Sequence, residues 1–206
     1  MAHLALQSGK DGLIRLLNLD NLSGAGAPGH TGGEVGTVIS VPQGNVVLTA
    51  PAVWVRPSDS STWAFVANGS GVSALELVFD AKGNPSLTNV WESSNAGTSP
   101  LIANGVLYVA ATGNLRALDP ATGTQLWQNT QIGSIHWASP VVANGMLYIG
   151  NQSAQFTAFG LASEAASVPA LPGLALWAAL VTLVCLGARE SRLLSARRPA
   201  SSPQPS

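Results

Sequence analysis

The residues that could carry out chemistry are few and lie far apart in this 206-residue sequence. The three histidines are His3, His30 and His136, and Cys185 is the single cysteine. A structural zinc site needs four ligands at short, regular spacings, and an internal disulfide needs two cysteines. The sequence therefore predicts neither a zinc site nor a disulfide.

The acidic residues fit turns better than catalysis. Asp20, Asp80 and Asp119 each precede a short turn-like segment, in which an aspartate side chain can hydrogen-bond the backbone two residues further on. No Ser, His and Asp combination has a recognisable spacing, so we expect no enzymatic activity and no cofactor. His136 and Trp137 could contact a ligand at the centre of the fold, although packing at a sheet edge is the favoured interpretation.

Charge and glycine patterns exclude two further functions. Only 9% of the residues are charged, against roughly 25% in an average soluble domain, and the net charge is −1. Because nucleic-acid binding requires Lys and Arg to neutralise phosphates, we expect no nucleic-acid partner. The glycine-rich stretch 24–36 lacks the Gly-Lys-Ser/Thr ending of a phosphate-binding loop, and we expect it to be a flexible loop.

A repeat of about forty residues organises most of the chain. Residues 99–110, SPLIANGVLYVA, recur as SPVVANGMLYIG at 139–150. In each copy an Asn-Gly pair, which favours a type I′ hairpin turn, precedes a run of apolar residues typical of a strand. Four short strands every forty residues indicate propeller blades. The blade-like units within 1–161 fall at about 1–24, 50–91, 97–128 and 136–161.

One string in the repeat resembles a known family. Residues 117–127, ALDPATGTQLW, carry the pattern A-x-D-x-x-T-G-x-x-x-W. This pattern resembles the PQQ-type β-propeller family, which includes the outer-membrane assembly lipoprotein and the quinoprotein dehydrogenases. The resemblance implies an all-β, incomplete propeller of about three four-stranded antiparallel blades, with a tryptophan docked between adjacent blades. The residues to which it gives this docking role are Ala117, Asp119, Thr122, Gly123 and Trp127, with Trp91 equivalent in the preceding copy.

The number of blades limits what the chain can form alone. Propellers have four to eight blades and this family uses seven or eight, so a ring of ~40-residue blades needs on the order of 300 residues. Open blade faces would expose apolar surface. We therefore expect a fragment of a longer protein, or a ring completed by a partner, another copy or further blades. The N-terminus lacks the basic and apolar regions of a secretory signal, which also favours a longer parent protein.

The C-terminal part has a different composition. Residues 170–188 carry no charge, and a helix of this length at ~1.5 Å per residue reaches ~28 Å, close to the ~30 Å apolar core of a bilayer. We expect a linker over 162–172, a transmembrane helix over 173–188 and a disordered basic tail over 189–206; a buried core helix is the alternative. The positive-inside rule places the tail in the cytoplasm and the propeller on the periplasmic or outer side of a bacterial membrane. The arginines that set this topology are Arg189, Arg192, Arg197 and Arg198.

A short proline motif precedes the apolar segment. The motif, the apolar helix and the arginines together resemble C-terminal sorting signals of the exosortase type, in their PEP and IPTL varieties. Pro172-Gly173-Leu174 stands where Ser-Glu-Trp usually follows. The resemblance implies release to the cell surface after cleavage, and a plain single-span anchor is the alternative. The motif residues are Val168, Pro169, Leu171 and Pro172.

These observations favour binding over catalysis. We expect a non-enzymatic, membrane-anchored or surface-sorted propeller module for binding or protein interaction. The alternative is the C-terminal part of a PQQ-dependent quinoprotein oxidoreductase whose cofactor site lies in other blades. Acidic calcium ligands and adjacent cysteines in those blades would favour the alternative.

Overall fold

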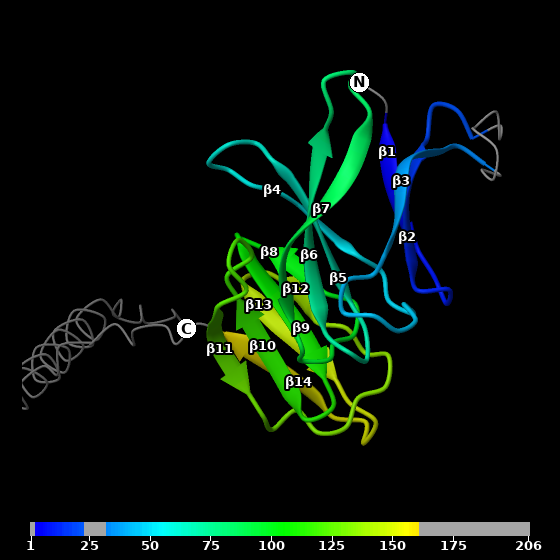
Figure 1. The fold of residues 1–206 in the computed structure, drawn as a ribbon. Coiled ribbons are helices and arrows are strands. Elements are labelled where there is room, and N and C mark those ends of the chain that lie inside the picture. Colours follow the sequence, from blue (N-terminus) through cyan, green and yellow to red (C-terminus); the bar gives the residue numbers. More distant parts are fainter. Residues whose placement is uncertain (1–2, 23–31, 161–206) are drawn as a thin grey trace, which may run out of the picture. The chain divides into compact units, whose positions relative to one another are not determined.

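The fold consists of β-strands throughout the part of the chain that the structure describes. The computed structural model describes residues 3–22 and 32–160, and every regular element in these ranges is a strand (Figure 1). The strands are β1 (Leu4–Ser8), β2 (Leu13–Asn18), β3 (Glu34–Ser40), β4 (Ala52–Val55), β5 (Thr62–Ala67), β6 (Val72–Phe79), β7 (Pro85–Ser93), β8 (Leu101–Ala103), β9 (Val106–Ala111), β10 (Asn114–Leu118), β11 (Gln125–Asn129), β12 (Val141–Ala143), β13 (Met146–Gly150) and β14 (Phe156–Gly160).

The strands form four antiparallel sheets in which sequence neighbours pair with each other. The strand orders are β1-β2-β3, β4-β5-β6-β7, β8-β9-β10-β11 and β12-β13-β14. The first strands of the two central sheets, β4 and β8, contact each other, and β3 contacts β7. Successive up-and-down sheets that meet in this way are the blades of a partial β-propeller, and we call them blades 1 to 4 in chain order.

The turns have the geometry that their residues favour. Asn104 and Gly105 have φ values of 48° and 71°, and Asn144 and Gly145 have φ values of 50° and 74°. Two consecutive left-handed residues define a type I′ turn, and its twist matches the twist of the strands on either side. The prediction of Asn-Gly hairpins in both copies of the repeat is therefore confirmed.

The core lies between the blades. One cluster, with Ile14, Val66 and Leu75, joins blades 1 and 2. A second, with Phe65, Val72, Leu107 and Val109, joins blades 2 and 3. A third, with Ala110, Leu115, Leu147 and Ile149, joins blades 3 and 4. Because alternate residues of β9 enter the second and third clusters, both faces of this strand are buried, which explains its almost uninterrupted apolar sequence.

Blade 1 has a strand that the sequence did not predict. The expectation of a flexible loop over 24–36 is wrong for Glu34–Gly36, because these residues begin β3. β3 pairs with β2, and Ile39 lies opposite Ile14 and Val35 opposite Leu16. The register shifts within this pair, and Gly36 has a φ of 71°. A bulge of this kind lets a glycine-containing segment join a sheet that its composition does not favour.

The predicted C-terminal elements lie outside the described residues. This applies to the transmembrane helix at 173–188, to the sorting motif from Val168 to Pro172 and to the four arginines of the tail. Among residues 3–22 and 32–160, no helix has the length and apolar character that crossing a bilayer requires.

Candidate functional site

The aspartates Asp119 and Asp80 build turns, as their sequence context indicates. Asp119 Oδ1 accepts hydrogen bonds from the backbone N–H groups of Ala121 (2.8 Å) and Thr122 (3.0 Å). Asp80 Oδ1 accepts from two N–H groups of its own hairpin, both at 2.8 Å. Asp20 differs, because its carboxylate binds the backbone N–H and the ring Nδ1 of His3. The three carboxylates bind different groups and do not converge on one site.

Trp91 connects blade 2 to the Asp119 turn of blade 3. Its indole Nε1 donates a hydrogen bond of 2.9 Å to the Pro120 carbonyl oxygen. Its ring lies against Gly123, at which an added Cβ would come within 2.9 Å of Trp91 Cε3. The ring also packs on Phe65, with the ring centroids 5.9 Å apart. The turn and the tryptophan therefore meet across a blade boundary.

Trp127 makes a weaker contact between blades 3 and 4. Its ring meets Phe159 of β14 edge-on, with a centroid distance of 5.2 Å. It lies in register with the buried Ala117 on β10, yet its side chain remains 39% exposed. The structure thus buries Trp91 more deeply than Trp127, although the sequence pattern is clearer around Trp127.

Arg116 is a buried residue that the sequence analysis missed. It is 2% exposed, and its Nη2 donates to the carbonyl oxygens of Asn95 (3.1 Å) and Ala96 (2.9 Å) in the connector between blades 2 and 3. Burial lowers the pKa of its guanidinium. The signal that could have revealed it is a single arginine between Leu115 and Ala117, within an otherwise apolar strand.

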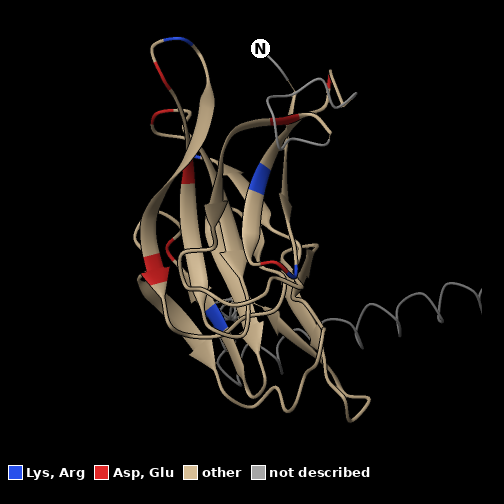
Figure 2. Cartoon of the chain, turned by 45° about the vertical axis from the view of Figure 1, so that its right-hand side comes forward, with Lys and Arg blue, Asp and Glu red and all other residues tan. Residues whose placement is uncertain are grey.

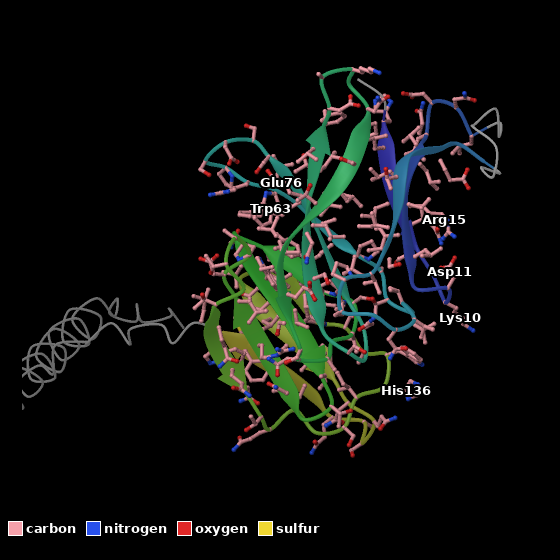
Figure 3. The ribbon with its side chains drawn as sticks, in the orientation of Figure 1. Lys10, Asp11, Arg15, Trp63, Glu76 and His136 are labelled. Atoms are coloured by element: carbon pink, nitrogen blue, oxygen red, sulfur yellow. The ribbon has the colours of Figure 1, made fainter. Side chains whose placement is uncertain are left out.

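A cavity of about 310 Å³ lies at one end of the blades. The connectors that lead into blades 2, 3 and 4 supply residues 45–46 and 48–49, 96–98 and 135–137. The hairpin turns of blades 2 and 3 supply residues 68–69 and 111–112. His136, labelled in Figure 3, belongs to this loop cluster. The cavity is therefore assembled from equivalent loops of three successive blades.

The lining of this cavity is uncharged and partly aromatic. The part of the chain that the structure describes contributes no Asp, Glu, Lys or Arg to it. Trp137 is 59% exposed, and the ring of His136 meets it edge-on at 4.6 Å. Thr98 is 8% exposed, and its Oγ1 is buried without a hydrogen-bond partner. The structure places the His136–Trp137 pair at the cavity, whereas the neighbouring Ile135 enters the core.

Charged groups are sparse among the described residues (Figure 2), and two Arg–Asp ion pairs each lie within a single hairpin. Arg15 binds Asp11 at 2.6 Å at one end of blade 1 (Figure 3), and this contact holds the pKa of the Asp11 carboxyl below its usual value. Arg56 lies 3.4 Å from Asp59. In the described ranges no three His, Cys, Asp or Glu side chains come together to hold a metal ion.

Comparison with known proteins identifies related sequences and folds. A model of the family described as outer membrane protein assembly factor BamB matches residues 31–165. The crystal structure of the computationally designed Ika4 protein aligns with a TM-score of 0.50 and 14% identity, over 78% of this chain and 86% of that chain. This likeness shows a common fold.

Two natural proteins align less well. BamB from Moraxella catarrhalis gives a TM-score of 0.36 at 14% identity, over 76% of this chain and 60% of that chain. A europium-containing methanol dehydrogenase gives a TM-score of 0.34 at 19% identity, over 48% of this chain and 19% of that chain. The chain therefore spans less than two thirds of either natural protein. No curated protein matches the sequence.

Proposed function

Because the chain belongs to the family described as outer membrane protein assembly factor BamB, we propose that it is a non-enzymatic protein-interaction module built from PQQ-like propeller blades. The family description supports a role in which the blades bind other proteins. The blades are rigid supports with few charged groups, and their connecting loops are free to contact partners.

The observation that carries this proposal is the open face of blade 4. Val141, Tyr148 and Phe156 lie on this face, because Val141 pairs with Tyr148 in register and the rings of Tyr148 and Phe156 stack at 5.5 Å. Phe156 is 73% exposed. At the equivalent position of blade 3, Tyr108 packs into the core cluster between blades 3 and 4. Phe156 is therefore exposed where the equivalent residue of blade 3, Leu115, is fully buried.

The repeat also indicates what would cover this face. Burying apolar surface contributes about 25 cal/mol per Å², so an exposed aromatic sheet face favours association. We propose that the face packs against another blade of the same repeat type, supplied by a partner protein, by a second copy or by further blades. This contact would continue the stacking that joins blades 1 to 4.

We also propose that residues 173–188 anchor the module in a bacterial membrane, with the blades on the periplasmic or outer side. The uncharged run over 170–188 and the four arginines after it support this topology. The Pro-containing motif from Val168 to Pro172 supports removal of the anchor by a sorting protease. A plain anchor would leave the same blades at the membrane surface.

Photocrosslinking tests the proposed function. p-Benzoylphenylalanine replaces Phe156 in one variant and Phe79 in a control, where the native ring is also exposed but lies at the end of the β6–β7 hairpin. In the native cells, we expect irradiation to link position 156, and not position 79, to another polypeptide or to a further blade. Absence of a crosslink at both positions, in variants that melt like the unmodified chain, would contradict the proposal.

A titration with PQQ and Ca²⁺ separates this proposal from the oxidoreductase alternative. We expect no saturable change in the PQQ absorption spectrum. Saturable binding together with reduction of an electron-accepting dye would favour the quinoprotein oxidoreductase.

A further inference from the structure

We infer that the cavity at the blade ends is a peptide-binding site that accepts one uncharged, apolar or aromatic side chain from an extended segment of a partner protein. The inference rests on the proposed function in one respect, which is that the ligand belongs to a protein. The site itself is separate from the open face of blade 4.

The walls of the cavity expose large apolar side chains on connectors. Val46 and Leu48 come from the connector that enters blade 2, and Trp137 comes from the connector that enters blade 4; all three are exposed. The core residue Ile135 also lines the cavity. Connectors usually carry polar residues, so apolar side chains from two of them around one cavity indicate a binding surface.

The absence of charge in the lining determines the class of side chain. Among residues 3–22 and 32–160, no Asp, Glu, Lys or Arg lines the cavity. Moving an ionised side chain out of water without an opposite charge carries a large free-energy cost. An aliphatic or aromatic side chain has no such cost, and a ring can pack on the indole of Trp137. The cavity therefore selects uncharged apolar side chains.

A buried hydroxyl adds a polar point of contact. Thr98 Oγ1 has no partner, although Thr98 is more than nine-tenths buried at the cavity wall. Thr49 occupies the same position in the preceding repeat, and its hydroxyl donates to the Ala67 carbonyl oxygen. An unpaired buried hydroxyl costs about 1–3 kcal/mol, and a peptide N–H or C=O group can satisfy it. The cavity lining therefore includes one hydroxyl whose hydrogen-bonding capacity no described group satisfies.

Hydrogen bonds hold the cavity walls in position before any ligand binds. Arg116 fixes the Ala96 carbonyl, and Thr112 Oγ1 donates to the Ile135 carbonyl at 2.8 Å. Asn68 Nδ2 donates to the Gly44 carbonyl at 2.7 Å, beside the connector that carries Val46. Each of the connectors that enter blades 2, 3 and 4 is therefore held by one of these hydrogen bonds. Binding then requires little ordering of the protein, which favours affinity for a short segment.

The size of the cavity fits one side chain with its adjacent backbone. Its volume of about 310 Å³ lies at the lower end of the range for ligand pockets, about 300–1,000 Å³. A folded domain could not enter it. An extended segment can place a single phenylalanine or leucine inside while the rest of its chain runs across the loops.

The test uses the full chain and capped hexapeptides, Ac-Gly-Ser-X-Ser-Gly-Ser-NH₂, in which X is Phe, Leu, Asp or Lys. NMR follows the indole N–H resonance of Trp137. We expect the Phe and Leu peptides to shift this resonance saturably, and the Asp and Lys peptides to bind at least about tenfold more weakly. Equal binding of all four peptides, or shifts confined to other tryptophans, would overturn the inference.

Substitutions identify the residues that make the site. We expect Trp137→Ala to weaken binding of the Phe peptide about tenfold or more, and the control Trp127→Ala to leave it unchanged. Thr98→Val should weaken binding about threefold to tenfold while the melting temperature stays the same or rises. Thr49→Val should lower the melting temperature, because its hydroxyl already has a partner. Full affinity in Trp137→Ala would overturn the inference.

The two proposals fail in different ways. A crosslink from position 156, combined with peptides that leave the Trp137 resonance unchanged, would retain the interaction module and eliminate the cavity site. Peptide binding at Trp137 without any crosslink from position 156 would retain the cavity and eliminate the open face as the interaction surface.

Discussion

The contact between Trp91 and Gly123 allows a direct test of how blades 2 and 3 are joined. Gly123 has a φ of 72°, and a Cβ at this residue would lie 2.9 Å from Trp91 Cε3 and 3.0 Å from Cδ2. Carbon atoms in favourable contact are about 3.5–4.0 Å apart. Gly123→Ala therefore introduces both a strained backbone and a clash across the blade boundary.

Mutating Gly123 and Trp91 singly and together separates the free-energy cost of the backbone strain from that of the clash. A non-glycine residue in the left-handed region costs about 1–2 kcal/mol, and overpacking costs about 1–3 kcal/mol more. Trp91→Ala removes a hydrogen bond worth about 0.5–1.5 kcal/mol and part of a ring from the core. Burial of a whole tryptophan is worth about 3–5 kcal/mol, so for this half-buried ring we expect a loss of about 2–3 kcal/mol.

The clash cannot exist once the ring is gone. In the Trp91→Ala background we therefore expect Gly123→Ala to cost only the backbone strain, about 1–2 kcal/mol. The coupling free energy between the two substitutions should be about 1–3 kcal/mol. Gly113 is the matched control, since its φ is 69° and an added Cβ meets nothing within 4 Å. Gly113→Ala should cost the same in both backgrounds.

Urea unfolding followed by far-UV circular dichroism provides the four free energies of each cycle. Circular dichroism is preferable to fluorescence here, because one substitution removes a tryptophan. A coupling within about 0.5 kcal/mol of zero for Trp91 and Gly123 would refute the proposed packing, since independent sites are additive to that degree. A coupling as large at Gly113 would refute the assignment to the ring contact.

Four further outcomes are expected. Trp127→Ala should lower the free energy of unfolding, measured by urea titration, by only about 1–2 kcal/mol, because Trp127 is 39% exposed. A loss of about 3–5 kcal/mol, as for a fully buried tryptophan, would contradict this partial burial. Arg116→Ala should cost about 2–4 kcal/mol by the same assay, because two connector carbonyls lose their donor; an unchanged value would exclude an anchoring role. Hydrogen bonds, that from Asn84 above all, lower the pKa of the Asp80 carboxyl, so the stability that its charged form contributes is complete above the unfolded pKa of about 3.9 and is lost as pH falls through the lower folded pKa. Between about pH 5 and 2 the melting temperature should therefore fall less in Asp80→Asn than in the unmodified chain. An identical pH dependence of the two melting temperatures would contradict this expectation. In a variant without the native cysteine, a membrane-impermeant maleimide should label Ser163→Cys and not Ser201→Cys in spheroplasts; the reverse pattern would refute the proposed topology.

Blades 1 and 4 differ in the contacts of equivalent side chains. In blade 4, Phe156 is exposed and stacks on the half-buried Tyr148. In blade 1, Arg15 occupies the strand position that corresponds to Arg116, yet it binds Asp11 in its own hairpin instead of a neighbouring connector.

Much of the fold could be predicted because its determinants are local. The Asn-Gly pairs impose hairpins through their own backbone preferences, and the forty-residue repeat reveals blades because each unit repeats the same strands and turns. The turns at Asp80 and Asp119 follow from hydrogen bonds within a few residues. None of these features depends on distant parts of the chain.

Tertiary structure decided the features that depend on neighbouring blades. β3 escaped prediction because its glycine-containing segment becomes a strand only by pairing with β2. The deeper burial of Trp91 than of Trp127 depends on which turn lies opposite each ring, and the burial of Arg116 depends on a connector from another blade. The cavity arises only where loops of three blades converge. The repeat, most strands and most turns follow from the sequence alone, because their energetics are local. The packing of one blade on the next forms the site, because its residues are far apart in the chain.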